Sequence, residues 1–324
     1  MRLAARLLLC MALSLGGAAA AQGPQSAELA KQARSGNSKA LEELQQLAGQ
    51  GNVLALHHLG LMHVEGKGVA RDEARAVELF RRAAEQGHLP SAHNLAVLLE
   101  RSSGELRDAD AALYWYRYAA ERGYARAQTG LGRMLADGTG TAPDLQEARA
   151  WFEKAAAQGE PHGTYRLGML YLEGRGVERD EAKAAQLIRT AAKGNDRDAQ
   201  HQLAVLLSTA RGVQRDDREA LLWLRKAAAQ NHREAQYLLA VVYAHGLYGV
   251  QPDAAVAAEW LRRSAKQGYA PAQYALGVAY YSGRGVPRDA HEALGWLVEA
   301  EKNGHPEAIE AMKELRERRK ASGK

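Results

Sequence analysis

Residues 171–195 read YLEGRGVERDEAKAAQLIRTAAKGN, and the signals that decide the fold lie together in this stretch. The glycines Gly174 and Gly176 are followed by Asp180 and then by an alanine-rich run that ends at Asn195. Aspartate is favoured at a helix N-cap, and glycine or asparagine is favoured where a helix ends in a left-handed residue. The stretch therefore predicts the end of one helix, a glycine turn, and a second helix that begins after Asp180.

The same pattern recurs along the chain at a nearly constant step, which is the signature of a repeat protein. The leucine of an A-x-x-x-L-G pattern returns after 36 residues five times, then after 37, and after a further 36 the position is taken by Met312. An aspartate keeps the same register. The leucines are Leu59, Leu95, Leu131, Leu167, Leu203, Leu239 and Leu276, and the aspartates are Asp72, Asp108, Asp144, Asp180, Asp216, Asp253 and Asp289.

Each unit predicts two helices that approach each other closely. A small residue follows the leucine, which allows a neighbouring helix to pack near the backbone. These small residues are Gly60, Ala96, Gly132, Gly168, Ala204, Ala240 and Gly277. The second helix is capped by the aspartate, contains paired alanines, and is expected to end in a left-handed residue at Gly87, Gly123, Gly159, Asn195, Asn231, Gly268 and Gly304.

The glycine pair itself invites comparison with a phosphate-binding loop. Such a loop follows a strand and leads into a helix N-terminus, and its Walker form also requires G-x-x-x-x-G-K-[ST]. Here the pair follows a predicted helix and recurs as Gly66-Lys67-Gly68-Val69 and Gly283-Arg284-Gly285-Val286. We therefore interpret it as a turn between two helices, not as a nucleotide site.

The repeat unit resembles the Sel-one-like repeats, which are relatives of the tetratricopeptide repeats. The pattern A-x-Y-x-L-G, G-x-G-V-x-x-D and E-A-x-x-W-x-x-K-A-A-x-x-G is nearly complete from Ala272 to Gly304. The resemblance implies an all-α, right-handed α-α superhelix of about seven 36-residue hairpins with terminal capping helices. It also implies a binding scaffold for other proteins, of a kind often secreted or periplasmic in bacteria. A cysteine-rich branch of the family is linked to β-lactams, but this chain lacks that branch's cysteines and has no S-x-x-K motif.

Four segments are expected. Residues 1–21 resemble a cleavable secretory signal, since Arg2 and Arg6 precede an apolar run over 7–15 and an alanine-rich cleavage site. It is followed by an N-terminal helical cap over 22–53, by seven repeats over 54–307, and by a polar helix with a basic tail over 308–324. The sole cysteine, Cys10, lies in the signal, which excludes disulfides and cysteine metal sites from the mature chain. We expect a periplasmic or secreted protein without membrane insertion after cleavage.

The charge distribution argues against a nucleic-acid partner. Between Gln22 and Met312 the chain contains 35 Lys and Arg against 36 Asp and Glu, so the net charge of +5 comes from the two ends. A nucleic-acid protein needs a basic face or stripe.

The strongest candidate partner-binding residues occupy one column, two residues before each repeat leucine. They lie on the first helix, which lines the concave face of related solenoids, and tyrosine provides rigid, amphipathic contact area. Packing remains the alternative role for this column. A shared metal is disfavoured because helices of successive repeats lie about 10 Å apart. The column contains Thr129 and His57 as well as the candidates His93, Tyr165, His201, Tyr237 and Tyr274.

A second column holds all five tryptophans on the second helix, where the repeat pattern asks for a bulky packing residue. A sugar-stacking surface is the alternative function for Trp115, Trp151, Trp223, Trp260 and Trp296. Irregular loops over 101–105 and 246–250 are further places for partner contacts or for drift.

These patterns favour an exported, non-catalytic scaffold or adaptor that binds a protein or peptide in its groove and needs no cofactor or metal. Binding of carbohydrate or peptidoglycan fragments is the alternative. A β-lactam-binding or β-lactamase-like hydrolase is a remote one.

Overall fold

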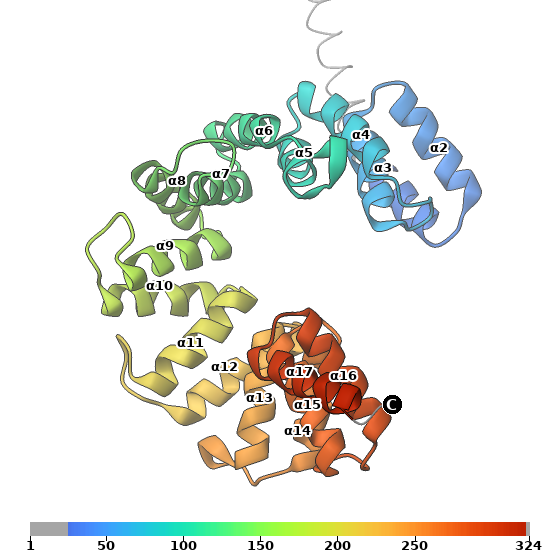
Figure 1. Cartoon of the computed structure of the whole chain (residues 1–324). Coiled ribbons are helices and arrows are strands. Elements are labelled where there is room, and N and C mark those ends of the chain that lie inside the picture. Colours follow the sequence, from blue (N-terminus) through green and yellow to red (C-terminus); the bar gives the residue numbers. More distant parts are fainter. Residues whose placement is uncertain (1–24, 322–324) are drawn as a thin grey trace, which may run out of the picture. The chain divides into compact units, whose positions relative to one another are not determined.

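A computed structural model describes residues 25–321, and over this range the chain is built of helices joined by short turns, with no strand (Figure 1). The predicted signal segment, residues 1–21, lies outside the described residues. Residues up to Gln158 form one compact unit and residues from Gly159 onward form a second. Among residues 25–321, no helix combines the length and the apolar character needed to span a bilayer.

In the first unit, a helix over 25–34 precedes helices of nearly uniform length. They are α2 (Ser38–Gly49), α3 (Val53–Glu65), α4 (Glu73–Glu85), α5 (Leu89–Arg101), the short 3-10 helix η1 (Gly104–Leu106), α6 (Ala109–Glu121), α7 (Ala125–Asp137) and α8 (Leu145–Ala157).

The second unit continues the same alternation. It comprises α9 (Pro161–Glu173), α10 (Glu181–Lys193), α11 (Arg197–Thr209), α12 (Asp217–Ala229), α13 (Arg233–His245), the 3-10 helix η2 (Leu247–Gly249), α14 (Ala254–Ala265), α15 (Ala270–Ser282), α16 (Ala290–Lys302) and α17 (Pro306–Ala321). The predicted all-α fold of helical hairpin repeats is confirmed.

The predicted helix ends are also confirmed. Each aspartate of the repeated column is an N-cap whose side chain accepts a backbone N–H, as Asp180 does from Lys183 at 2.9 Å. All seven predicted left-handed termini have positive φ, including Asn195 at 69° and Asn231 at 59°. The glycine pairs are turns, because Gly174 ends α9 in a left-handed conformation that caps it, and Asp180 then begins α10.

Close helix approach explains the small residue after each leucine. A Cβ atom placed on Gly132 would lie 2.7 Å from Cε1 of Phe152, and one on Gly168 would lie 2.8 Å from Cγ1 of Ile188. Both contacts are shorter than van der Waals packing allows. The two helices of these hairpins therefore pack so closely that a larger side chain at Gly132 or Gly168 would displace the facing helix or its side chains.

A buried glutamine network ties three helices together in four of the repeats. Gln200 is 1% exposed, and its Nε2 donates to the carbonyl of Ala192 at 3.2 Å, near the end of the preceding helix. Its Oε1 accepts from Nε2 of Gln230, the residue that follows the next helix, at 2.8 Å. Gln128, Gln236 and Gln273 repeat this arrangement with Gln158, Gln267 and Asn303. The network satisfies buried polar groups and sets the position of each first helix against the second helices on either side.

The two irregular loops differ in their contacts. Ser102, in the loop after α5, is buried, and its hydroxyl donates to Oε2 of Glu73 at 2.9 Å. The loop after α13 holds the extra residue of the sixth repeat, and Tyr248 adopts a φ of 58° there. The first loop is thus tied to the repeats by a buried hydrogen bond, while the second accommodates an insertion and packs Tyr248 against the hydrophobic cluster of its unit.

Candidate partner-binding surface

The histidine and tyrosine column forms a set of ring contacts between adjacent repeats. Five of its members pack on the residue that immediately precedes the next first helix, and these residues form a second column. Tyr165 instead lies beside His162 on its own helix, with the ring centroids 5.8 Å apart. The contacts are His57 with His88 at 4.8 Å, His93 with Tyr124 at 5.6 Å, His201 with His232 at 4.5 Å, Tyr237 with Tyr269 at 5.5 Å and Tyr274 with His305 at 4.4 Å between ring centroids. These rings stabilise the stacking of one repeat on the next.

Burial fixes the charge state of the column histidines. It lowers the pKa of His57 to about 3 and the pKa values of His93 and His201 to about 4, because the protonated ring would lose its hydration. Burial also raises the pKa of Tyr165 to about 12. The burial that causes these shifts favours the packing role for these four side chains.

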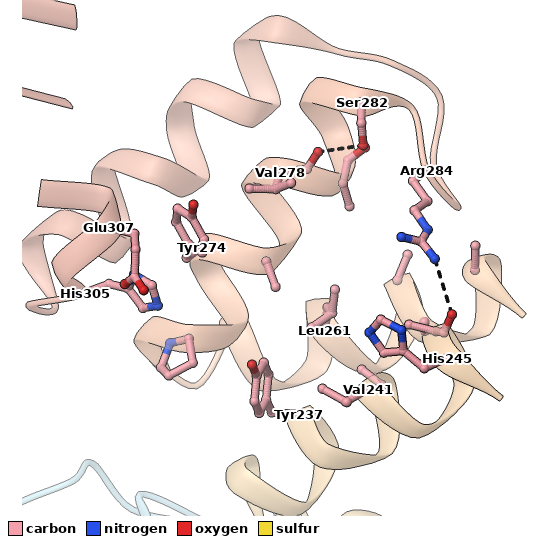
Figure 2. Close-up of a pocket in the computed structure, with 18 residues that line it drawn as sticks. Tyr237, Val241, His245, Leu261, Tyr274, Val278, Ser282, Arg284, His305 and Glu307 are labelled. Carbon is pink, nitrogen blue, oxygen red and sulfur yellow. Dashed lines mark hydrogen bonds and ion pairs between the residues drawn. The ribbon is translucent and has the colours of Figure 1, made fainter. Parts of the chain in front are cut away.

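Tyr237 and Tyr274 are placed differently, because both line a pocket of about 450 Å³ between α13, α14 and α15 (Figure 2). Val241 and Leu261 form part of its apolar wall, and Val278 is 43% exposed there. The structure thus brings two of the five predicted residues into one cavity. The remaining candidates, His93, Tyr165 and His201, do not line it.

Polar groups lie at the two ends of this pocket. His245 and Arg284 lie at one end, and His305 with Glu307 lies at the other, as Figure 2 shows. The Nδ1 atom of His305 is 3.2 Å from Oε2 of Glu307. An apolar cavity with few polar groups at its margins is the usual form of a ligand site.

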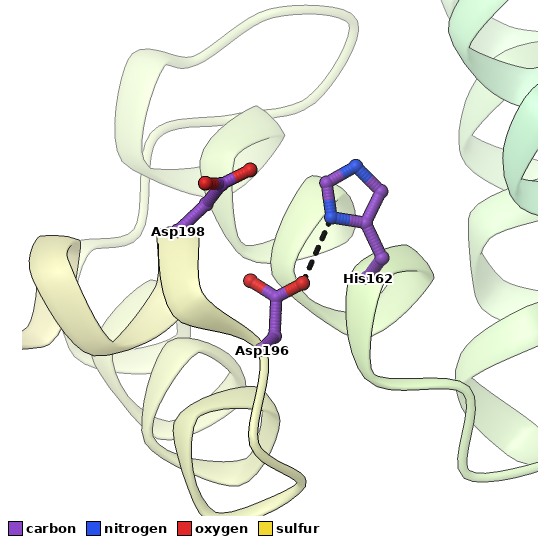
Figure 3. A group of neighbouring side chains, drawn as sticks. All are labelled: His162, Asp196 and Asp198. Carbon is purple, nitrogen blue, oxygen red and sulfur yellow. Dashed lines mark hydrogen bonds and ion pairs between the residues drawn. The ribbon is translucent and has the colours of Figure 1, made fainter. Parts of the chain in front are cut away.

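A second cluster brings together His162, Asp196 and Asp198, whose potential ligand atoms lie within 4.8 Å of one another (Figure 3). Nδ1 of His162 is 2.9 Å from Oδ2 of Asp196, and Nε of Arg166 is 3.2 Å from Nε2 of the same ring. Asp196 also caps α11 through a 2.7 Å bond from the amide of Ala199. Since both imidazole nitrogens and both Asp196 oxygens are already engaged, the cluster acts as a helix-capping network between α9 and α11.

The tryptophan column packs within the repeats. Trp115, Trp151 and Trp223 are 7–8% exposed, and Nε1 of Trp223 donates to Oε1 of Glu219 at 3.0 Å. The same carboxylate pairs with Arg189 on the preceding second helix. Sugar stacking needs exposed ring faces, so the buried members of this column do not supply the carbohydrate surface considered above.

Fold and site together define a class of protein, an array of helical hairpin repeats with a pocket between the helices of successive hairpins. The sequence profile of the Sel1 repeat matches seven consecutive segments, 53–88, 89–124, 125–160, 161–196, 197–232, 233–269 and 270–305. The chain belongs to the Sel1 repeat family. Its members are generally protein-interaction scaffolds and generally non-catalytic.

Two solved structures illustrate the similarity. A Sel1 repeat protein from Oxalobacter formigenes is 30% identical with a TM-score of 0.65, and the match covers 96% of this chain and 91% of that one. A protective antigen present in uropathogenic Escherichia coli strains, displaying an SLR fold, is 32% identical with a TM-score of 0.59. That match covers 89% of this chain and 64% of the other, so this chain spans less than two thirds of that antigen. No match was found among the curated proteins.

Proposed function

We propose that this protein is an exported, non-catalytic scaffold that binds a protein or peptide partner in the pocket between α13, α14 and α15. The observation behind the proposal is the pocket itself, where Tyr237 and Tyr274 from successive repeats line one cavity with an apolar wall and polar ends. Apolar cavities edged by a few polar groups bind extended side chains well, and tyrosine is enriched at protein interfaces. Membership of the Sel1 repeat family supports a protein partner.

Export to the periplasm or the medium is part of the same proposal and is supported by the sequence of residues 1–21. Cell fractionation followed by N-terminal sequencing tests it. A mature N-terminus near Gln22 in the periplasmic or extracellular fraction is expected, and an intact Met1 in the cytoplasm would refute export.

Partner binding is tested by cross-linking the immobilised protein to an extract at about 150 mM salt and comparing two variants. Val278→Asp places a charge on the apolar wall of the pocket. Leu222→Asp is the matched control, because Leu222 is 58% exposed on α12 and does not line the pocket. Alanine substitutions of the tyrosines are less informative, since both rings also pack between repeats.

We expect one or a few proteins to be retained by the wild type and by Leu222→Asp, and to be lost from Val278→Asp. Retention that is equal on all three proteins would place binding elsewhere. Absence of any specifically retained protein would contradict the scaffold function.

A further inference from the structure

The central residue of the glycine turn is basic in four repeats, and in three of these a glutamate neutralises it. Lys67 lies 3.5 Å from Glu65, and Arg175 lies 3.7 Å from Glu173, in each case between Nζ or Nη1 and a carboxylate oxygen. In the fifth repeat the equivalent Arg211 donates to Glu181 at 2.9 Å. The turn cation is thus ordinarily paired within the chain.

Arg284 occupies this position in the seventh repeat and lacks both glutamates. Ser282 stands where the first and fourth repeats have Glu65 and Glu173, two residues before the cation. Ala254 stands where the fifth repeat has Glu181, directly after the capping aspartate of the preceding second helix. Within residues 25–321, the hydrogen bond found for the Arg284 guanidinium runs from Nη2 to the carbonyl of Ala244 at 3.3 Å, and no carboxylate contacts it.

The same two replacements help to form the pocket. Ser282, Ala254 and Arg284 all line it, so small side chains take the places of two acidic ones beside an unpaired cation (Figure 2). His245 lies at the same end, at the last position of its first helix, where three other repeats have an acid, namely Glu65, Asp137 and Glu173. The opposite end holds Glu307. The pocket therefore has a cationic end, an apolar centre and a polar end where Glu307 lies beside His305.

The dimensions fit a short extended segment. Tyr274 and Ser282 are eight residues apart on α15, which at about 1.5 Å per residue gives a length of about 12 Å. An extended peptide rises about 3.3 Å per residue, so about four residues span this distance. The cavity of about 450 Å³ is within the range of ordinary ligand sites.

We propose that the pocket binds an extended peptide segment of about four residues, with an apolar side chain at its centre and a carboxylate that pairs with Arg284. This inference rests on the proposed scaffold function and specifies the chemistry of its partner. The carboxylate is either an Asp or Glu side chain or the C-terminus of the partner. Both would form a charge-assisted hydrogen bond with the free guanidinium N–H groups.

Selection from a library of random peptides on the full mature chain, followed by fluorescence anisotropy with synthetic peptides, tests this proposal. We expect enriched peptides to combine an apolar residue with a nearby carboxylate. Arg284→Gln should weaken their binding about fivefold, and Arg284→Glu about twentyfold, because an attraction is replaced by a repulsion. Arg175→Gln is the matched control, since that turn arginine already has Glu173 as its partner, and it should leave binding unchanged.

Exchanging the charges of the peptide and of residue 284 distinguishes an ion pair from a purely structural effect of Arg284. A peptide with Lys in place of its acidic residue should bind Arg284→Glu better than it binds the wild type. C-terminal amidation of the acidic peptide separates the two sources of the carboxylate, because it abolishes binding only if the terminus is the ligand.

The possible failures are distinct. Two outcomes would overturn the charge assignment and leave the scaffold function standing. In the first, the enriched peptides lack a carboxylate. In the second, they bind Arg284→Glu as well as wild type but lose binding to Val278→Asp. If no peptide discriminates between wild type and Val278→Asp, both proposals fail. If no peptide is enriched and the chain self-associates in a way that Arg284→Glu abolishes, the occupant of the pocket is a second copy of the chain. That result would also overturn the peptide assignment.

Discussion

Replacing Gln236 by leucine removes one buried glutamine network while keeping a side chain of similar size. Gln236 is 1% exposed, and its Nε2 donates to the carbonyl of Ala228 at 3.1 Å and to Oδ1 of Asn231 at 3.4 Å. Its Oε1 accepts from Nε2 of Gln267 at 2.8 Å. The amide of Asn231 also donates to the Ala228 carbonyl at 3.1 Å, so this carbonyl keeps one partner in the variant.

The two well-formed bonds of Gln236 are worth about 1 kcal/mol each, since the exposed Gln267 can be rehydrated and the Ala228 carbonyl is not orphaned. The 3.4 Å contact adds little. We therefore expect the local free energy of opening to fall by about 2 kcal/mol, which corresponds to about thirtyfold faster amide exchange in α12, α13 and α14.

Hydrogen exchange read by mass spectrometry is the appropriate assay, because a repeat array opens locally and a single melting temperature averages over its units. Gln186→Leu is the control, since Gln186 is exposed on α10 and its side chain takes no part in such a network. A change below about 0.5 kcal/mol in Gln236→Leu, or an equal change in the control, would refute a stabilising role for the network.

Three further predictions concern the packing of the repeats. Gly168→Leu should lower the melting temperature by several degrees, because even a Cβ atom would lie 2.8 Å from Ile188, and an unchanged melt would disprove the close helix approach. Trp223→Phe should destabilise by about 1 kcal/mol in urea denaturation through loss of the 3.0 Å bond to Glu219, and equal stability would show that only the ring matters. The pKa of His201 falls from 6.5 to about 4 on folding, so the unfolded chain takes up a proton first, and the free energy of unfolding should decrease as pH falls from about 6.5 to about 4. His201→Gln should flatten that pH dependence in urea titrations, and an identical slope would contradict it.

Much of the fold follows from local chemistry in the sequence. Asp180 caps a helix and Asn195 ends one because of backbone preferences that need no information from distant residues. The close approach at Gly168 was likewise predictable, since a small residue recurs at a fixed place beside an apolar one.

Features that depend on three helices at once were not predicted. Gln200 lies on α11, and its partners Ala192 and Gln230 belong to α10 and to the residue after α12. Gln128, Gln200, Gln236 and Gln273 do recur at the repeat step, but that spacing does not tell which distant groups they bond or that they are buried. Within the candidate column, His93, His201, Tyr237 and Tyr274 all pack on the residue before the next first helix. Only Tyr237 and Tyr274 also line the pocket, and spacing alone does not distinguish these two positions from the others.

The sequence does contain a signal for the cationic end of the pocket. The turn cation at Arg284 differs from Arg211 only in its surroundings, because Ala254 replaces the glutamate found thirty residues before Arg211. Comparing charge pairs between repeats, in place of single columns, would have identified it.

The turn at Tyr248 shows how a helical repeat array can gain a residue without losing its packing. The additional residue is taken up between α13 and α14, while α13 keeps thirteen residues and Asp253 still caps α14. An insertion here leaves the helix-to-helix contacts in register, so the cost of a longer loop is mainly its closure entropy, which grows slowly with length. Such a turn takes up an additional residue without disturbing the helices on either side. Because Tyr248 itself packs against the hydrophobic cluster of this unit, the exposed Gly249 beside it is where an engineered loop or epitope could be introduced.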